Sequence, residues 1–328
     1  MYMAVEVESA RGVESVRVLY TGGGGAGTEA LWNLLKHRHD QHFADADVGR
    51  VNPIVPADKA HQVPFASDPN FKGVMKALCE DLQIDVLVPG VDEELEQLSL
   101  TREQFAPTVI LMPTFAFTRT MLDKFEFARA LAALGVQVPR TQLLADSRLW
   151  SAYPCIVKPR RGRGSRGVTV VANSIELDAM RTAVIERSDE YVVQELAGGT
   201  EYSVQVVADS DQRLRAVFPA RIIAKRGITI SAIGEQNQAV IKACDRIHQS
   251  LPTSGCYNVQ GILGDDLSFL PFEINPRVST TLCLAVASGI DPVEIFTAPA
   301  ERQGLVPFEA GVALNRFWHN AFTRPSAD

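Results

Sequence analysis

The most informative segment of the chain covers residues 153–167 and reads YPCIVKPRRGRGSRG. Its first half is apolar, ends at Lys158 and predicts a buried strand. Its second half carries four arginines and three glycines, which predicts a flexible, cationic loop that can fold over a polyphosphate. The loop does not match the GxxxxGK[ST] pattern of a P-loop. Taken alone, it also fits a solvated basic hairpin.

A second polar segment covers residues 271–277 and reads PFEINPR. Side chains alternate along a strand, so Glu273, Asn275 and Arg277 share one face. Carboxylate and amide oxygens suit Mg²⁺, and Gln260 offers another amide oxygen from a neighbouring strand. A lone Glu-x-Asn pattern also fits a surface strand, and only its combination with the basic loop favours a metal-nucleotide site.

The first third of the chain alternates short apolar strands with helices. Strands are predicted at 16–20, 41–44, 85–89 and 108–112, and helices at 28–37, 70–82 and around 93–98. This alternation is typical of a parallel sheet with right-handed crossovers. We therefore expect an open parallel-sheet α/β domain over residues 15–115, with Thr28 capping its first helix.

A glycine-rich turn at residues 22–27 follows the first of these strands. Such a turn lets backbone N–H groups approach an anion, and in dinucleotide-binding folds an acidic residue about 20 positions further on meets the ribose. Asp45 or Asp47 could take that role, which leaves open an NAD-dependent oxidoreductase that uses the loop at 22–27. A tight turn, or a pocket for another ligand, explains the same glycines.

The second half of the chain has a different pattern, with strands predicted at 168–171, 190–195, 201–207, 214–218 and 269–274. Few helices separate them, which is typical of antiparallel sheets. Helical periodicity covers 120–134. We expect a second domain over residues 116–325, with a lid subdomain at about 150–197, and a flexible leader over residues 1–14.

The composition is that of an ordinary globular protein, with 46% hydrophobic and 22% charged residues among 328. The net charge of −7 provides no general attraction for nucleic acid. We find no apolar run of about 18 residues and no signal peptide, so we expect no membrane partner and a cytoplasmic location. The five cysteines form no CxxC pair, and we expect them to be reduced core residues.

Several segments, taken in order, resemble the ATP-grasp superfamily, in particular the branch similar to the large subunit of carbamoyl phosphate synthetase and its stand-alone carboxylate–amine ligase relatives. The resemblance covers residues 16–322 and implies an adenine nucleotide held between two antiparallel sheets. Its markers are the glycine turn, DEEL at 92–95, DKF at 123–125, IVKP at 156–159 with its loop, VQEL at 193–196, GTEYS at 199–203, NVQ at 258–260 and FEINPR at 272–277.

The resemblance also implies which residues hold the nucleotide. Lys124 and Lys158 match the two cations that contact phosphates, and Glu201 matches the carboxylate that meets the ribose hydroxyls. A mobile lid at 165–167 and a hinge at 195–196 complete the site. The implied nucleotide-binding residues are Lys124, Lys158, Ser165, Gly167, Glu195, Leu196, Glu201, Gln260 and Glu273.

Metal, catalytic and substrate roles follow from the same resemblance. Many ATP-grasp enzymes have a carboxylate where this chain has Gln260, and an amide is the variant in the carbamoyl phosphate synthetase branch. The implied ligands of Mg²⁺ or Mn²⁺ are Gln260, Glu273 and Asn275. The implied catalytic residues are Lys158, Arg277, Ser165 and Arg166, and substrate contacts are expected at Gly23, Glu93, Arg221, Arg226 and Arg277.

The implied reaction is the ATP-dependent ligation of a carboxylate to an amine. The carboxylate attacks the γ-phosphoryl group to give an acyl phosphate and ADP, and the amine then displaces phosphate to form an amide bond. Phosphorylation of bicarbonate or carbamate, as in carbamoyl phosphate synthesis, is the alternative on the same fold. The expected partners are small-molecule substrates, and a homodimer through the first domain is compatible with this class.

Overall fold

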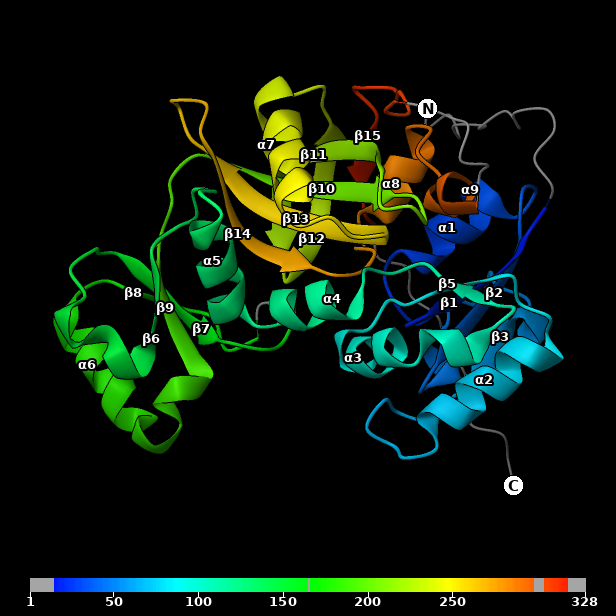
Figure 1. Cartoon of the computed structure of the whole chain (residues 1–328), viewed down its shortest axis with the longest axis horizontal. Coiled ribbons are helices and arrows are strands. Elements are labelled where there is room, and N and C mark those ends of the chain that lie inside the picture. Colours follow the sequence, from blue (N-terminus) through cyan, green and yellow to red (C-terminus); the bar gives the residue numbers. More distant parts are fainter. Residues whose placement is uncertain (1–14, 165, 298–303, 318–328) are drawn as a thin grey trace.

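The computed structural model describes residues 15–164, 166–297 and 304–317. Three β-sheets follow one another along the longest axis of the molecule (Figure 1). A parallel sheet lies at one end, a four-stranded antiparallel sheet at the other, and a six-stranded antiparallel sheet between them. The predicted α/β class, with an open parallel sheet followed by two antiparallel sheets, is confirmed. The leader expected over residues 1–14 lies outside the described residues.

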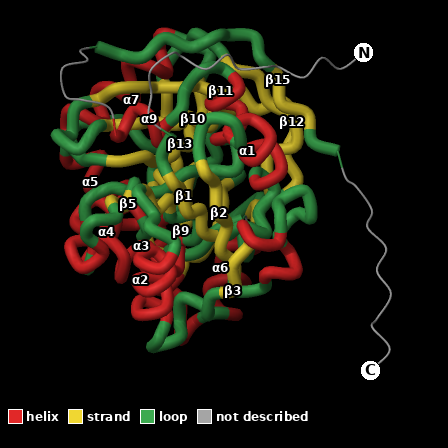
Figure 2. Tube along the Cα trace, turned by 90° about the vertical axis from the view of Figure 1, so that its right-hand side faces the viewer, coloured by secondary structure: helices red, strands yellow, loops and turns green. Residues whose placement is uncertain are grey.

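The parallel sheet contains five short strands, β1 (Arg17–Thr21), β2 (Asp40–Asp45), β3 (Ala60–Gln62), β4 (Val86–Val88) and β5 (Val109–Ile110). Its faces are covered by α1 (Thr28–Leu35), α2 (Phe71–Asp81) and α3 (Asp92–Leu100). Val18 and Tyr20 belong to the core on the α1 side, whereas Leu19 belongs to the core around α2 and α3. This alternation along one strand places the helices on opposite faces, as Figure 2 shows.

The strand order β3-β2-β1-β4-β5 makes β1 the central strand. The chain runs outward from β1 to β3 and then returns to β4 on the other side. The carboxyl ends of β1 and β4 therefore form a topological switch point, the place where ligands of open parallel sheets bind.

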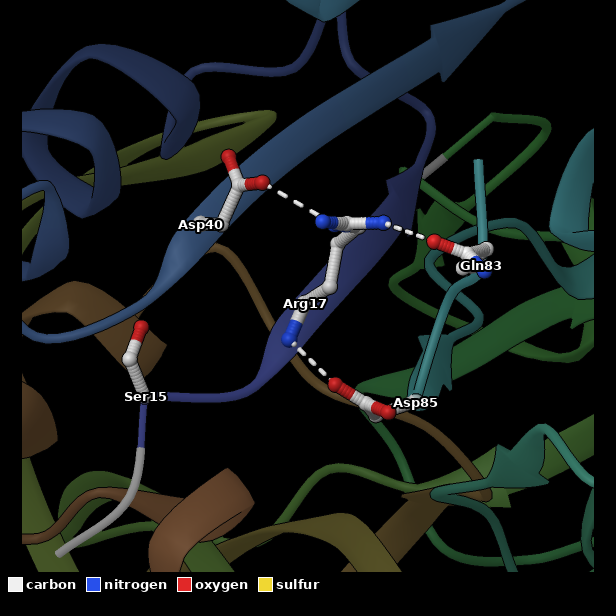
Figure 3. A pocket seen from close by; sticks show the side chains of 5 residues that line it. All are labelled: Ser15, Arg17, Asp40, Gln83 and Asp85. Atoms are coloured by element: carbon white, nitrogen blue, oxygen red, sulfur yellow. Dashed lines mark hydrogen bonds and ion pairs between the residues drawn. The ribbon is translucent and has the colours of Figure 1, made fainter. Parts of the chain in front are cut away.

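Arg17 ties the opposite, amino ends of these strands together (Figure 3). Its backbone N–H donates to Asp85 Oδ2 at 2.7 Å, and its guanidinium donates to Asp40 Oδ2 at 3.1 Å and to Gln83 Oε1 at 3.4 Å. These side chains and Ser15 line a polar hollow. The hollow lies at the wrong end of the sheet for a switch-point ligand.

The six-stranded sheet has the order β14-β13-β10-β11-β12-β15. Its strands are β10 (Thr200–Ala208), β11 (Leu214–Arg226), β12 (Ile228–Gly234), β13 (Gly255–Leu263), β14 (Phe269–Asn275) and β15 (Ala313–Asn315). One face packs against α7 (Gln238–Ser250), whose buried Val240, Cys244 and Ile247 recur at helical spacing. We did not predict β12 or α7, and for β13 we predicted a strand at Gln260 without its bounds. β11 extends eight residues beyond the predicted end at Phe218.

The four-stranded sheet has the order β6-β9-β7-β8 and carries α6 (Ser174–Ala183) on its outer side (Figure 1). Its strands are β6 (Thr141–Leu143), β7 (Cys155–Pro159), β8 (Thr169–Val171) and β9 (Tyr191–Glu195). Cys155 and Val157 of β7 and Val193 of β9 form its core with Leu177 of α6. The other face of β7 is turned toward the six-stranded sheet.

Two predicted helices differ in the structure. In place of one helix over 120–134 there are two, α4 (Phe115–Met121) and α5 (Lys124–Ala133), because Asp123 starts a new helix. Its Oδ1 accepts hydrogen bonds from the N–H groups of Phe125 at 3.0 Å and Glu126 at 3.3 Å. Thr28 is the first residue of α1 and does not cap it, because its hydroxyl donates to the Gly23 carbonyl at 2.7 Å.

The remaining helices are short. The last two α-helices are α8 (Leu282–Ala287) and α9 (Pro292–Thr297). The 3₁₀ helices are η1 (Val48–Arg50), η2 (Ala57–Lys59), η3 (Arg102–Phe105), η4 (Leu144–Leu149) and η5 (Ile185–Glu190).

All five cysteines are buried with free thiols, as predicted. Among the described residues there is no helix with the length and hydropathy needed to cross a membrane.

Gly255 joins the two halves of the chain by close backbone packing. Its φ is +82°, and an added Cβ would lie 2.4 Å from the Met112 carbonyl carbon. We therefore expect Gly255→Ala to lower the free energy of unfolding by more than about 1 kcal/mol, measured by urea denaturation. The matched control is Gly73→Ala in α2, where only open space surrounds the added methyl among the described residues. It should raise stability by about 0.5–1 kcal/mol, and equal stability of Gly255→Ala and wild type would contradict the packing.

Candidate active site between the two antiparallel sheets

Lys158 ends the apolar part of β7 and projects from the four-stranded sheet toward the six-stranded one. Its Nζ donates to Gln194 Oε1 of β9 at 2.8 Å and to the Phe272 carbonyl of β14 at 3.4 Å. Burial, together with the positive charges of Lys124 and Lys225, lowers the pKa of Lys158 to about 8, although Glu273 opposes the shift. An ammonium group therefore lies where the two antiparallel sheets meet.

A β-bulge in β14 brings that strand up to Lys158. Gln260 of β13 pairs with Glu273, but the next residue, Gly261, pairs with Pro271, so Phe272 is the extra residue. The ring of Phe272 lies 5.5 Å from Lys158 Nζ. The bulge lets Phe272 contact Lys158 while the adjacent Glu273 contacts a second lysine.

That second lysine is Lys124, the first residue of α5. Its Nζ lies 3.1 Å from Glu273 Oε1 and donates to the Gly162 carbonyl of the glycine-rich loop at 2.8 Å. Burial raises the pKa of Glu273, but Lys124 and Lys158 outweigh it, and the pKa lies below the usual value. The carboxylate is therefore ionised between two ammonium groups.

Glu273 shares its face of the six-stranded sheet with two amides. Gln260 lies directly opposite Glu273 in the antiparallel pair, and Asn275 is two residues further along β14. Among the described residues no three His, Cys, Asp or Glu side chains form a metal-binding group. A carboxylate with two amide oxygens fits Mg²⁺, which completes its shell with water and substrate phosphates.

Apolar side chains cover the surface of the four-stranded sheet beside Lys158. Ile156 precedes Lys158 by two residues and pairs with Val170 of β8, so these three side chains share a face. Val170 is 59% exposed and Leu196, just after β9, is 41% exposed. An exposed apolar surface next to a buried ammonium is the combination that a purine base and its phosphates require.

Two further predicted nucleotide residues differ in their placement. Glu195 pairs with Cys155, so its side chain is on the opposite face of the four-stranded sheet from Lys158, whereas Glu201 shares the face of Gln260 on the six-stranded sheet. Glu195 is held at the end of β9, because its N–H donates to the Arg140 carbonyl at 2.9 Å and its Oε2 accepts from Arg140 N at 3.3 Å. Glu201 Oε1 accepts a hydrogen bond from Lys225 Nζ at 2.7 Å. We did not predict a role for Lys225, which lies on the part of β11 that extends beyond the predicted strand.

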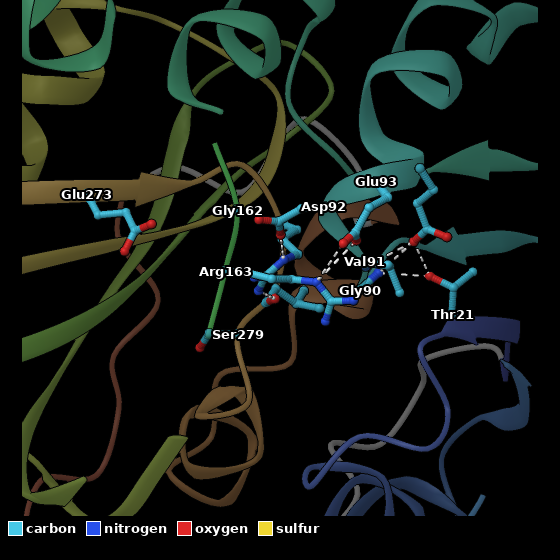
Figure 4. Close-up of polar contacts among 12 residues, drawn as sticks. Thr21, Gly90, Val91, Asp92, Glu93, Gly162, Arg163, Glu273 and Ser279 are labelled. Atoms are coloured by element: carbon cyan, nitrogen blue, oxygen red, sulfur yellow. Dashed lines mark hydrogen bonds and ion pairs between the residues drawn. The ribbon is translucent and has the colours of Figure 1, made fainter. Parts of the chain in front are cut away.

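The glycine-rich loop after β7 lies against the N-terminal half of α3. Gly162, Gly164 and Gly167 all have positive φ, between +69° and +116°. Arg163 Nε lies 3.1 Å from Glu93 Oε2, and Arg161 Nη1 lies 2.9 Å from Glu96 Oε1. Figure 4 shows Arg163 and Glu93 pointing toward each other. Arg166 is exposed. Ser165 lies outside the described residues.

The structure brings some predicted substrate residues together and separates others. Arg277 forms an ion pair with Asp92 at the start of α3, next to Glu93. Arg221 pairs with Tyr202 across the strands and therefore lies on the opposite face from Glu201, with its Nε 3.4 Å from Glu235. Arg226 is exposed at the tip of the β11–β12 hairpin.

The glycine turn of the first domain is held by its own backbone. The N–H of Gly23 donates to the Ala44 carbonyl at 3.0 Å, and the N–H of Gly24 donates to Asp45 Oδ2 at 2.8 Å. The other Asp45 oxygen accepts from the N–H of Asp47 at 2.9 Å. Asp45 therefore stabilises the turn, and its carboxylate is already engaged at the position where a ribose partner was considered.

Comparison with known proteins shows a family match over part of the chain. Residues 121–281 match the model described as ATP-grasp domain. The chain is 23% identical over 204 residues to a D-alanine–D-alanine ligase from Bacteroides fragilis, over 53% of this chain and 62% of the ligase. It thus spans less than two thirds of that relative.

Solved structures agree on the fold. L-amino acid ligase from Bacillus licheniformis superposes with a TM-score of 0.66 at 14% identity, over 86% of this chain and 73% of that chain. Carboxyaminoimidazole ribonucleotide synthase from Aspergillus clavatus, complexed with ATP, gives a TM-score of 0.63 at 18% identity, over 81% and 71%. Residues 121–281 of this chain thus match an ATP-grasp domain, and these solved structures share the fold.

Proposed function

We propose that this chain is an ATP-dependent carboxylate–amine ligase that releases ADP and phosphate. The observation that carries the proposal is the convergence of Lys124, Lys158 and Glu273 between two antiparallel sheets. Two buried ammonium groups suit a polyphosphate, and the apolar face beside them suits an adenine ring. The ATP-grasp domain, and relatives that are named as ligases, support this assignment.

In this proposal the cations of the site exchange internal partners for the nucleotide. Lys124 would leave Glu273 and the Gly162 carbonyl, and Lys158 would leave Gln194, to neutralise phosphate charge. Glu273, with Gln260 and Asn275, would hold Mg²⁺. The metal, when bound, supplies positive charge at the transferred phosphoryl group.

The loop over residues 160–167 would then exclude water from an acyl phosphate formed with the substrate carboxylate. Residues 15–115 would supply the first domain and residues 116–325 the nucleotide-binding domain, with 150–197 as its lid. Arg277, Glu93 and the turn around Gly23 border the space that we assign to the carboxylate and amine substrates.

Removing either the lysine or the carboxylate of the site should abolish turnover. We expect Lys158→Ala and Glu273→Ala each to lose ADP formation while remaining folded, because phosphate charge is then left unbalanced. The assay is ADP release from Mg-ATP across amino acids and small carboxylates, alone and in pairs, with mass detection of the product.

Lys76→Ala, which removes an exposed lysine of α2, is the matched control and should turn over normally. ADP release at the wild-type rate in either site variant would contradict the assignment of a ligase. ADP release with bicarbonate alone would replace amide formation with the carbamoyl-phosphate type of reaction.

The lowered pKa of Lys158 predicts a pH dependence of nucleotide binding. Because Lys158 loses its proton as the pH rises through about 8, and phosphates bind its charged form, affinity for Mg-ATP should be constant below that pH and fall above it. The fall should approach about tenfold per pH unit. Titration calorimetry at a series of pH values measures it.

The control for this prediction is Lys158→Met, which has no titrating group at that position. Its affinity should be weaker but constant from about pH 7 to about pH 9. A wild-type affinity that does not change across this range would show that Lys158 is not in contact with the phosphates.

A further inference from the structure

The first domain contributes a carboxylate to the edge of the nucleotide site. Asp92 is the first residue of α3, and its Oδ1 forms an ion pair with Arg277 Nε, 185 positions further along the chain. The two side chains are only 12% and 13% exposed. This contact links the switch-point edge of the parallel sheet to the connection between β14 and α8.

The ion pair orients the guanidinium. Nε is held by Asp92, and Nη1 donates to the carbonyl of Val278 at 2.9 Å. Within the described part of the chain, Nη2 has no hydrogen-bond partner. Arg277 also lies close enough to Glu273 to lower the pKa of that carboxyl, after burial and the two lysines. Two nitrogens are thus fixed and the third remains free at the phosphate end of the site.

Asp92 is itself held rigidly. The carboxylate of Glu94 accepts hydrogen bonds from the Thr21 hydroxyl and from the N–H groups of Gly90 at 3.1 Å and Val91 at 3.0 Å. Gly90 N–H also donates to Thr21 Oγ1 at 2.8 Å (Figure 4). These hydrogen bonds fix the turn before α3 against the end of β1. The backbone position of Asp92 is therefore fixed as well.

We infer that Asp92 is a positioning residue, which holds the Arg277 guanidinium so that its free edge meets the terminal phosphoryl group of the nucleotide. The first domain then completes the phosphoryl-transfer site of the ATP-grasp domain. This inference rests on the proposed function, because it assigns a nucleotide to the cleft between the sheets.

The test compares two nucleotides that differ only at the terminal phosphoryl group. Binding of Mg-AMP-PNP and of Mg-ADP is measured by titration calorimetry for wild type, Asp92→Asn, Arg277→Ala and the double variant. We expect Asp92→Asn to weaken AMP-PNP binding about tenfold or more, as for a hydrogen bond to a charged group, and to leave ADP binding unchanged. The double variant should bind AMP-PNP no more weakly than Arg277→Ala.

Two controls separate positioning from folding. Asp92→Glu keeps the charge and should recover part of the AMP-PNP affinity, while Glu103→Gln removes an exposed carboxylate outside the site and should match wild type. Unchanged AMP-PNP binding in Asp92→Asn, an equal loss for ADP, or additive effects in the double variant would each overturn the inference. Failure of the wild type to bind either nucleotide would instead overturn the proposed function on which it rests.

Discussion

The rest of the structure depends on the burial of Lys158 beside Lys124 and Glu273. Taking charged groups out of water costs several kcal/mol for each ion unless they are paired, so the three groups must lie close together. They come from three different elements, β7, α5 and β14, and their contacts fix how the two antiparallel sheets face each other. Because two ammonium groups face one carboxylate, the cleft keeps an excess of positive charge that a polyphosphate can neutralise.

Several other cations around the site are paired with carboxylates. Lys225 is paired with Glu201, and Arg277 is paired with Asp92. Arg161 and Arg163 of the glycine-rich loop are likewise paired with carboxylates of α3. A nucleotide therefore enters a site in which these cations already have partners. Its affinity depends on how much more strongly the cations bind phosphate than they bind the protein carboxylates.

The sequence predicted the class of fold and most strands of the first domain, because there the apolar runs are short, regular and bounded by glycine or proline. It placed Gln260 on a strand but did not give the bounds of that strand, β13, in which the polar Asn258 and Gln260 alternate with the apolar Tyr257 and Val259. The period of α7 was present in Val240, Cys244 and Ile247 and was overlooked among the strands. Lys158 and Glu273 could be singled out because a glycine-rich loop follows the one and strand alternation marks the other, whereas Lys124 was singled out only by the family resemblance. Asp92 and Lys225 could not, because their roles arise from pairs that only the packing of distant elements creates.

A crystal structure of the chain with Mg-AMP-PNP tests directly whether Lys124, Lys158 and Glu273 form the nucleotide site. We expect the nucleotide to lie between the two antiparallel sheets, the contact between Lys124 and Glu273 to open, and Lys124 and Lys158 both to contact phosphate oxygens. A nucleotide bound instead at the glycine turn over residues 22–27, with the lysine–glutamate contacts unchanged, would contradict this expectation.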